Sequence, residues 1–171
     1  MSQRVVVGID IGGGHLSAGV FALQDRRLLG EEEAPNRADS LPSLVGLLVD
    51  MVNRLVGAAG SEMRVEAVGV GVPGQVFGGV LVAASNLPYL RAADIAGEVG
   101  GRLGVPARLY NDANCAVCAE VLDSSERTRT AAMLTLGTGV GLGLFLDGQP
   151  YTGGRGMVEG GHSILVPGGR R

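Results

Sequence analysis

The beginning of the chain alternates between apolar runs and short polar or glycine-rich connections. Residues 5–11 form a continuous, largely β-branched run that ends in glycines, which predicts a buried strand. Residues 16–23 and 28–33 predict two further strands, joined by the polar residues 24–27. Three consecutive strands with such short connections predict an antiparallel meander.

A long amphipathic helix is predicted next, because apolar residues recur at helical spacing. It follows a loop at 36–40, in which Asp39 or Ser40 is a candidate N-cap, and it stops near Gly57–Gly60. Its apolar positions are Leu41, Leu44, Val45, Leu48, Met51, Val52, Leu55 and Val56.

The remaining elements alternate between strand and helix patterns, which is an α/β order. The order alone does not separate this fold from a Rossmann-type fold. We predict strands at 65–72 and 107–110, helices at 92–103 and 113–122, and hairpins at 75–83 and 131–146. The polar segment 123–130 is the candidate boundary between two lobes.

Composition narrows the class of protein. Hydrophobic residues make up 46% of the 171 residues and charged residues 18%, which excludes a globally disordered chain. The net charge of −3, without a basic stripe, argues against a nucleic-acid partner. We expect neither a signal peptide nor an apolar stretch of membrane-spanning length. These features predict a cytoplasmic protein without a membrane partner.

A first glycine turn, Gly12-Gly13-Gly14, follows Asp10-Ile11 and leads from one strand into the next. Backbone N–H groups at such a turn can approach phosphate oxygens closely, because glycine has no Cβ. A Rossmann fingerprint requires that the turn open a helix, and a Walker sequence requires Gly-Lys-Ser/Thr, so neither fits. The alternatives are an ordinary hairpin and a phosphate clamp in which Asp10 orients Mg²⁺ through water.

A second glycine turn, Gly137-Thr138-Gly139-Val140-Gly141, follows the apolar run at 131–136. Alternate glycines in a strand mark a close approach of another backbone or a ligand, and Thr138 adds a hydroxyl donor. The alternative is a bulged strand. Two such turns on either side of an acidic residue predict a nucleotide held from two sides, and hence phosphoryl transfer.

That acidic residue is Asp112, which follows Asn111 where a predicted strand stops and a helix begins. Asp112 is either an N-cap or a general base that takes the proton from a substrate hydroxyl during attack on a phosphate. Further along, Glu159 and His162 lie three residues apart and could bind neighbouring hydroxyls of a polyol. Cys115-x-x-Cys118 is either a redox or zinc pair or, as we favour, two small apolar residues on a helix.

Six motifs in order along the chain resemble those of the ROK family (repressors, open reading frames and sugar kinases), within the actin-like ATPase superfamily. They are Asp10-Ile11-Gly12-Gly13, Gly69-Val70-Gly71-Val72-Pro73-Gly74, Asn86-Leu87-Pro88, Asn111-Asp112-Ala113-Asn114, Leu136-Gly137-Thr138-Gly139-Val140-Gly141 and Glu159-x-x-His162.

The resemblance implies an α/β fold of the ribonuclease-H-like (actin-like ATPase) type. It implies a complete N-terminal lobe at residues 1–122 and the beginning of a second lobe at 123–171. It also implies a cytoplasmic enzyme that uses ATP and Mg²⁺ to phosphorylate a hydroxyl of a hexose or amino-sugar, as a glucokinase does. Dimers are common in the family, so a homodimer is an expected assembly.

The resemblance also assigns roles to single residues. Asp112 matches the catalytic base. The candidates for sugar binding are Gly74, Asn86, Asn111, Asp112, Glu159 and His162. The candidates for contacts to the nucleotide phosphates are Asp10, Gly12, Gly13, Gly14, Gly137, Thr138, Gly139 and Gly141.

Three departures from the family pattern stand out. His15 occupies a place where the first turn usually continues with Thr-Lys, and Gly160-Gly161 stands where Ile-Gly commonly precedes the histidine. Family members also run beyond this length, and their zinc-binding cysteine cluster follows the histidine, so zinc on His162 would require such a cluster. We therefore expect the N-terminal portion of a kinase, or a natural truncation.

Two alternatives to a kinase remain within the family. One is a sugar-sensing regulator without catalysis, although only residues 1–4 precede the first strand, where repressors carry a DNA-binding segment. The other is an inactive remnant that contributes an interaction surface.

Overall fold

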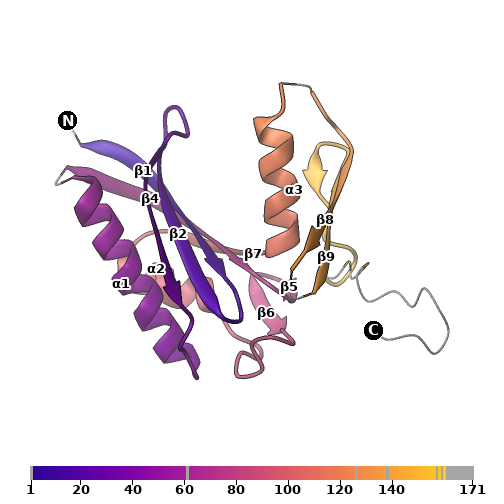
Figure 1. The fold of residues 1–171 in the computed structure, drawn as a ribbon, viewed down its shortest axis with the longest axis horizontal. Helices are drawn as coiled ribbons and strands as arrows, with labels where there is room; N and C mark the ends of the chain where they lie inside the picture. Colours follow the sequence, from indigo (N-terminus) through magenta and orange to yellow (C-terminus); the bar gives the residue numbers. More distant parts are fainter. Residues whose placement is uncertain are drawn as a thin grey trace. The chain divides into compact units, whose positions relative to one another are not determined.

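The structure is a computed structural model that describes residues 2–60, 62–125, 127–137, 139–156, 158 and 160. The chain divides into two compact units, Met1–Tyr110 and Asn111–Arg171. Each unit has its own sheet with at least one helix packed on it (Figure 1).

Unit 1 is built on a five-stranded sheet of order β3-β2-β1-β4-β7. The predicted meander is confirmed: β1 (Gln3–Ile11) pairs antiparallel with β2 (His15–Ala22), and β2 pairs antiparallel with β3 (Leu28–Pro35). β4 (Met63–Val72) pairs parallel with β1, and β7 (Ala107–Asn111) forms the edge. The carboxyl ends of β1 and β4 therefore lie at the same edge of the sheet, where the first glycine turn begins.

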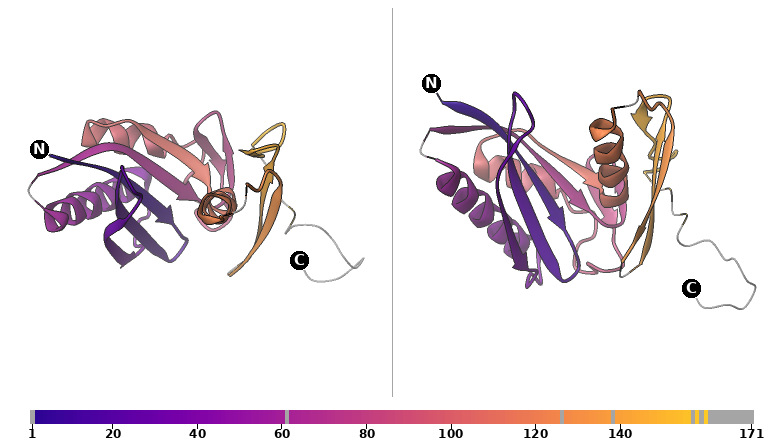
Figure 2. Two further views of the ribbon diagram at one scale, coloured as in Figure 1. Left: turned by 90° about the horizontal axis from the view of Figure 1, so that it is seen from above. Right: turned by 45° about the horizontal axis from the view of Figure 1, so that its top comes forward.

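Helices α1 (Leu41–Ala59) and α2 (Ile95–Leu103) pack against this sheet and against each other (Figure 2). Alternate residues of β1 point into the resulting core, so Val5, Val7, Ile9 and Ile11 are all buried. α1 follows Ser40 as its N-cap and contributes one apolar stripe to the core. The buried residues of that stripe are Leu44, Val45, Leu48, Met51, Val52 and Leu55.

The expectation that no apolar stretch reaches membrane-spanning length is wrong for α1. Its 19 residues have a mean hydropathy of 1.4 over the most apolar window, which is enough by length and composition to cross a membrane. The apolar stripe of α1 is nevertheless buried in the core of unit 1. Length and composition alone therefore do not distinguish α1 from a helix that packs in a protein core.

α2 begins three residues later than the sequence predicts. Ala92 has a positive φ of 49°, and Ala93 forms an isolated antiparallel bridge with Leu81 of β6 (Val80–Ala83). Asp94 then caps the helix, because its carboxylate accepts a hydrogen bond of 2.8 Å from the Gly97 N–H. The strand β6 and its partner β5 (Gln75–Phe77) form the predicted hairpin, with Gly78 and Gly79 at its turn.

Unit 2 contains α3 (Asp112–Asp123) and a small sheet of order β10-β9-β8. β8 (Ala131–Leu136) and β9 (Val140–Leu146) form the predicted antiparallel hairpin, and β10 (Gln149–Pro150) adds a short third strand. Asp147 and Gly148 have φ values of 53° and 86°, as a two-residue hairpin turn of the primed type requires. α3 packs on one face of this sheet.

The division into units falls before α3, whereas the sequence suggested a lobe boundary in the polar segment 123–130. The physical reason is the contact between α3 and the second sheet: a Cβ at Gly143 would overlap the carbonyl oxygen of Ala113 and lie 3.1 Å from Val117. The α3 backbone thus lies directly on β9. The division of the complete fold into lobes at 1–122 and 123–171 stays a prediction.

Candidate functional site

The first glycine turn is tied to the loop after β3 by Asn36. The Gly12 N–H closes the turn by donating to the His15 carbonyl at 2.8 Å. The Asn36 side-chain amide donates to the Gly12 carbonyl at 2.8 Å, and the Asn36 backbone N–H donates to the Gly14 carbonyl at 3.1 Å. The Asn36 side-chain oxygen in turn accepts from the Ala38 N–H at 3.1 Å. Two hydrogen bonds of good length therefore tie this turn to Asn36, one closes the turn itself, and a fourth orients the Asn36 side chain.

Asn86 lies against the same turn. A Cβ placed on Gly13 would be 3.1 Å from the Asn86 Cβ and 3.3 Å from its carbonyl oxygen, which is tighter than ordinary van der Waals contact. The fold therefore brings together a residue predicted to contact phosphate and a residue predicted to contact sugar. Gly13 and Asn86 are 73 positions apart in the sequence.

Two amides of the turn remain available to a ligand. Among the described residues, no acceptor takes a hydrogen bond from the Gly13 or Gly14 N–H, and both residues are exposed. Gly12 differs, because its N–H is already engaged with His15. Adjacent backbone N–H groups at a glycine turn are the donors that an anionic oxygen requires. Asp10, at the end of β1, is exposed directly before this turn.

A buried hydroxyl lies next to the Asn36 anchor. The Tyr89 hydroxyl oxygen is buried and has no hydrogen-bond partner that meets ordinary geometry among the described residues. Burial raises the pKa of Tyr89, and the neighbouring Asn36 side chain lowers it only in part. The phenol is therefore neutral at physiological pH and adds no charge to the first turn.

Gly74 follows β4 and Pro73, and only glycine fits its position. Its φ of 108° lies in a region that residues with a Cβ rarely adopt. A Cβ would also overlap the Ala83 carbonyl oxygen and lie 2.9 Å from Ala84. The loop that was predicted to contact sugar is therefore packed closely on the β5–β6 hairpin.

Asn111 and Asp112 occupy the junction between β7 and α3, as predicted. Asn111 is the N-cap, because its side-chain oxygen accepts a hydrogen bond of 3.1 Å from the Asn114 N–H. Asp112 is the first residue of the helix, half-buried, and its Oδ1 lies 2.8 Å from the Ala113 nitrogen, which donates to it. Asn111, and not Asp112, is therefore the N-cap of α3.

The second glycine turn belongs to the same unit as Asp112. The Gly137 N–H donates to the Gly139 carbonyl at 2.9 Å and closes the turn. Gly141 faces α3, since a Cβ there would lie 3.2 Å from the Ala113 Cβ and would overlap the Thr135 hydroxyl. The glycine at 141 therefore permits the close packing of β9 on the first turn of α3. Its role as a phosphate contact stays a prediction.

The two cysteines lie on α3, where Cys115 is exposed and Cys118 is half-buried. Burial raises the pKa of the Cys118 thiol, which disfavours the reactive thiolate. Among the residues that the structure describes, no cluster of three His, Cys, Asp or Glu side chains is arranged to hold a metal ion.

Three of the predicted site residues, Thr138, Glu159 and His162, lie outside the described residues. The predicted sugar contacts at Glu159 and His162, the hydroxyl of Thr138, and the conditional zinc ligand His162 therefore stay predictions.

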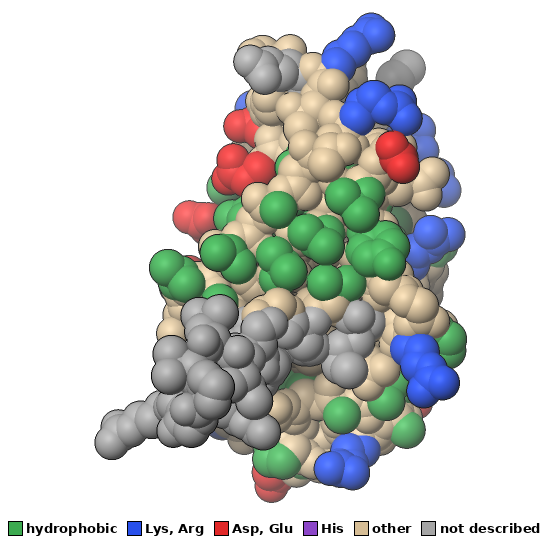
Figure 3. Space-filling view, turned by 90° about the vertical axis from the view of Figure 1, so that its right-hand side faces the viewer, with side chains coloured by type: hydrophobic (Ala, Val, Ile, Leu, Met, Phe, Trp, Pro, Cys, Tyr) green, Lys and Arg blue, Asp and Glu red, His purple; other side chains and the backbone are tan. Residues whose placement is uncertain are grey.

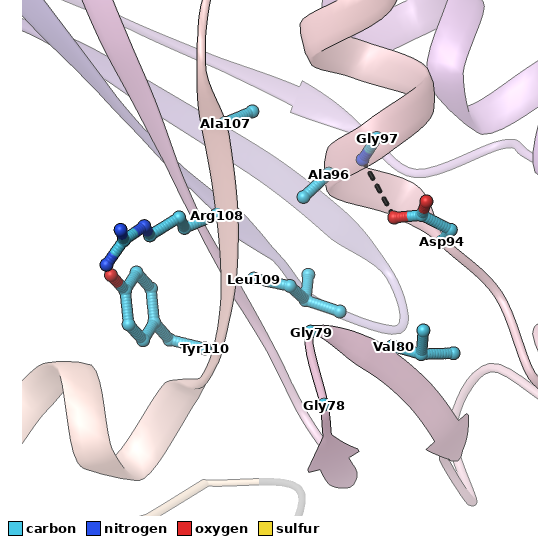
Figure 4. Close-up of a pocket in the computed structure, with 10 residues that line it drawn as sticks. All are labelled: Gly78, Gly79, Val80, Asp94, Ala96, Gly97, Ala107, Arg108, Leu109 and Tyr110. Atoms are coloured by element: carbon cyan, nitrogen blue, oxygen red, sulfur yellow. Dashed lines mark hydrogen bonds between the residues drawn. The ribbon is translucent and has the colours of Figure 1, made fainter.

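A separate cavity of about 460 Å³ lies in unit 1 between the β5–β6 turn, the N-terminus of α2 and β7 (Figure 4). Its charged residues are Asp94 and Arg108, and one carboxylate oxygen of Asp94 is engaged in capping α2. Arg108 and Tyr110 project from one side of β7 and Leu109 from the other (Figure 4). None of the predicted site residues lines this cavity.

Comparison with known proteins decides the family, because a model of the ROK family matches residues 6–171. The chain belongs to the ROK family. This ROK chain is 39% identical over 150 residues to an N-acetyl-D-glucosamine kinase of Salmonella paratyphi A. The match covers 85% of the chain and 48% of the relative, so the chain spans about half the length of the curated relatives it matches.

Solved structures agree with this assignment. A ROK family glucokinase from Streptomyces griseus, in complex with glucose and AMPPNP, matches with a TM-score of 0.83 and 28% identity, over 95% of this chain and 51% of that one. A ROK hexokinase from Thermus thermophilus matches with a TM-score of 0.78 and 33% identity, over 97% of this chain and 55% of that one. The predicted actin-like ATPase fold is thus confirmed.

Sequence reasoning missed Asn36 as part of the site. It lies in the loop between β3 and α1, where polar residues are common and no periodicity distinguishes one of them. The only signal in the sequence is its residue type, since an asparagine can donate and accept hydrogen bonds with one side chain.

Proposed function

We propose that this ROK chain provides the N-terminal half of an ATP-dependent sugar kinase, which phosphorylates a hydroxyl of a hexose or an amino-sugar. One observation carries the proposal: a half-buried carboxylate, Asp112, begins a helix at the strand–helix junction where the family pattern places a base. The N-acetyl-D-glucosamine kinases and glucokinase among its relatives support this substrate class. A kinase that consumes ATP acts where ATP is available, so the proposal places the chain in the cytoplasm.

The residues of the first turn fit a nucleotide phosphate. The Gly13 and Gly14 N–H groups are exposed, and Gly14 has open space around it, so an anionic oxygen can approach both amides. Asp10 is the acidic residue nearest to this turn in sequence and would hold Mg²⁺ through water. Bound ATP would supply the phosphoryl group, and Mg²⁺ would neutralise its charge.

The role proposed for Asp112 is that of a general base. Its carboxylate accepts the proton of the attacking sugar hydroxyl. Asn111 keeps the first turn of α3 in place through its capping bond to Asn114. Asn86 and Gly74, on two loops of unit 1, are the proposed sugar contacts among the described residues.

The proposal is tested by incubating the protein with ATP, Mg²⁺ and a panel of glucose, mannose, fructose, N-acetylglucosamine and N-acetylmannosamine. ADP release that depends on one of these sugars supports the kinase. Sugar binding in calorimetry without ADP release would instead support a sensor. The absence of both would support the remnant.

Asn36 is proposed as a positioning residue for the phosphate-binding turn. Replacing Asn36 with alanine removes the donor to Gly12 and the acceptor for Ala38, and we expect the Kd for Mg-AMPPNP to rise about tenfold, a loss of about 1.4 kcal/mol. Calorimetry measures this Kd. The neighbouring variant Arg37→Ala changes an exposed side chain and should leave it unchanged. If Asn36→Ala and wild type bound Mg-AMPPNP with equal affinity, the hydrogen bonds of Asn36 would not support nucleotide binding.

A further inference from the structure

Gly13 and Asn86 belong to two loops of unit 1 that are in direct contact. A Cβ built on Gly13 would lie 3.1 Å from the Asn86 Cβ and 3.3 Å from its carbonyl oxygen, so a side chain at position 13 fits only if Asn86 moves by a few tenths of an ångström. The φ angle of Gly13 lies outside the left-handed region that favours glycine. The contact with Asn86, and not the conformation of the turn, therefore requires glycine at this position.

The loop that carries Asn86 is also held from behind. Ala84, Leu87 and Leu90 are buried in the core of unit 1. The Leu87 N–H donates to the Ala84 carbonyl at 3.3 Å, and the Leu90 N–H donates to the Leu87 carbonyl at 2.9 Å. Gly74 packs on the same loop, since a Cβ there would lie 2.9 Å from the Ala84 Cβ. Because a close-packed core resists displacement, a push from position 13 acts mainly on Asn86.

The first glycine turn is held on its own side by Asn36, whose amide and backbone N–H donate to the carbonyls of Gly12 and Gly14. Tyr89, three residues after Asn86, lies beside the Asn36 side chain. The loop and the turn therefore meet at two points, one through Asn86 and one through Tyr89.

The Asn86 side chain is available to a ligand. It is exposed, and the residues that the structure describes offer it no hydrogen-bond partner. An asparagine amide can donate and accept hydrogen bonds, as can each hydroxyl of a sugar. Such bonds are formed over a narrow range of distances, so the affinity depends on where the backbone places the amide.

We propose that Gly13 is a positioning residue for sugar binding: because it has no Cβ, Asn86 can lie against the first glycine turn, where its amide meets a hydroxyl of the hexose or amino-sugar. Gly13 itself touches no sugar and acts through Asn86. This role is additional to the phosphate contact proposed for the Gly13 N–H. The inference rests on the proposed function, since it takes Asn86 as a sugar contact.

The test measures the Kd for N-acetyl-D-glucosamine and for glucose by calorimetry without nucleotide. The proteins are the 171-residue chain and the same chain joined to the second half of a ROK kinase. Gly13→Ala should raise the sugar Kd about tenfold, because the bond from Asn86 is lost. Gly14→Ala is the matched comparison. No atom lies within 4 Å of a Cβ built on Gly14, so its sugar Kd should stay within about twofold of wild type.

A double-mutant cycle separates positioning from a general loss of stability. Asn86→Ala alone should raise the sugar Kd about tenfold, and adding Gly13→Ala should raise it no further, because the contact that Gly13 positions is already gone. A general weakening of the fold would instead make the two losses multiply. Circular dichroism verifies that each variant is folded.

A measurement on the wild-type protein covers the case in which Gly13→Ala does not fold. Sugar added without nucleotide should shift the NMR signal of the Gly13 amide, because the residue that touches Gly13 takes up the ligand. An unshifted signal in a protein that binds sugar, a sugar Kd unchanged by Gly13→Ala, or losses that multiply would overturn the inference and leave the kinase proposal standing. Failure of both wild-type proteins to bind either sugar would overturn the proposed function and this inference together.

Discussion

Replacing Asp112 with asparagine is expected to lower kcat for sugar phosphorylation about 10³-fold, within the range for loss of a general base. The amide keeps an oxygen that can accept from the Ala113 N–H, as the carboxylate does at 2.8 Å, so α3 should begin at the same residue. It cannot take a proton from the sugar. The Kd for the sugar should therefore stay close to that of wild type, while turnover falls.

The measurement compares kcat and sugar Kd for both proteins, each as the chain alone and joined to the second half of a ROK kinase. Asp123→Asn is the control, since Asp123 is an exposed aspartate at the other end of α3. Near-normal turnover of the Asp112 variant would remove this residue from the role of base. A parallel loss of sugar binding would assign it to binding alone.

Replacing Gly143 with alanine is expected to lower the free energy of unfolding by about 3 kcal/mol, the upper part of the range for overpacking. The added methyl group would overlap the Ala113 carbonyl oxygen, which is backbone and cannot rotate away. Either α3 or β9 must shift. Because Asp112 precedes Ala113 directly, the shift should also displace the proposed base.

Chemical denaturation measures this loss, and Gly139→Ala provides the matched control. No atom lies within 4 Å of a Cβ built on Gly139, so that variant should unfold within about 0.5 kcal/mol of wild type. Equal stability of the Gly143 and Gly139 variants would contradict the close packing of β9 on α3.

The regular elements were predictable because their signals are local. β1 follows from a β-branched run that ends in glycine, and α1 from apolar residues at helical spacing. The start of α2 was not predictable: Ala92 and Ala93 favour a helix by propensity, but Ala93 pairs with Leu81 instead. A contact between residues that are remote in sequence overrides the local preference there.

In the candidate site, too, local features were predictable from the sequence and contacts between remote residues were not. The glycine turn at 12–14 and the junction at Asn111 and Asp112 are sequence motifs, and the structure places both where strands end. The anchoring of the turn by Asn36 spans 24 positions, and the contact of Gly143 with Ala113 joins β9 to α3. No pattern within one segment contains these contacts, so only the folded chain reveals them.

The β8 strand illustrates an intermediate case. Its almost uninterrupted apolar sequence, Ala131–Leu136 with one threonine, predicts a strand buried on both faces. In the structure, Ala131, Met133 and Thr135 on one face of β8 are half-buried, whereas Ala132, Leu134 and Leu136 on the other are exposed. Figure 3 shows hydrophobic side chains gathered on this side of the molecule.

The most direct test of the proposed function is a crystal structure of this chain, joined to the second half of a ROK kinase, with AMPPNP, Mg²⁺ and N-acetyl-D-glucosamine. The proposal predicts phosphate oxygens on the Gly13 and Gly14 N–H groups, and a sugar hydroxyl about 2.6–3.2 Å from an Asp112 carboxylate oxygen. A nucleotide bound away from these amides, or an Asp112 side chain directed away from the sugar, would contradict it.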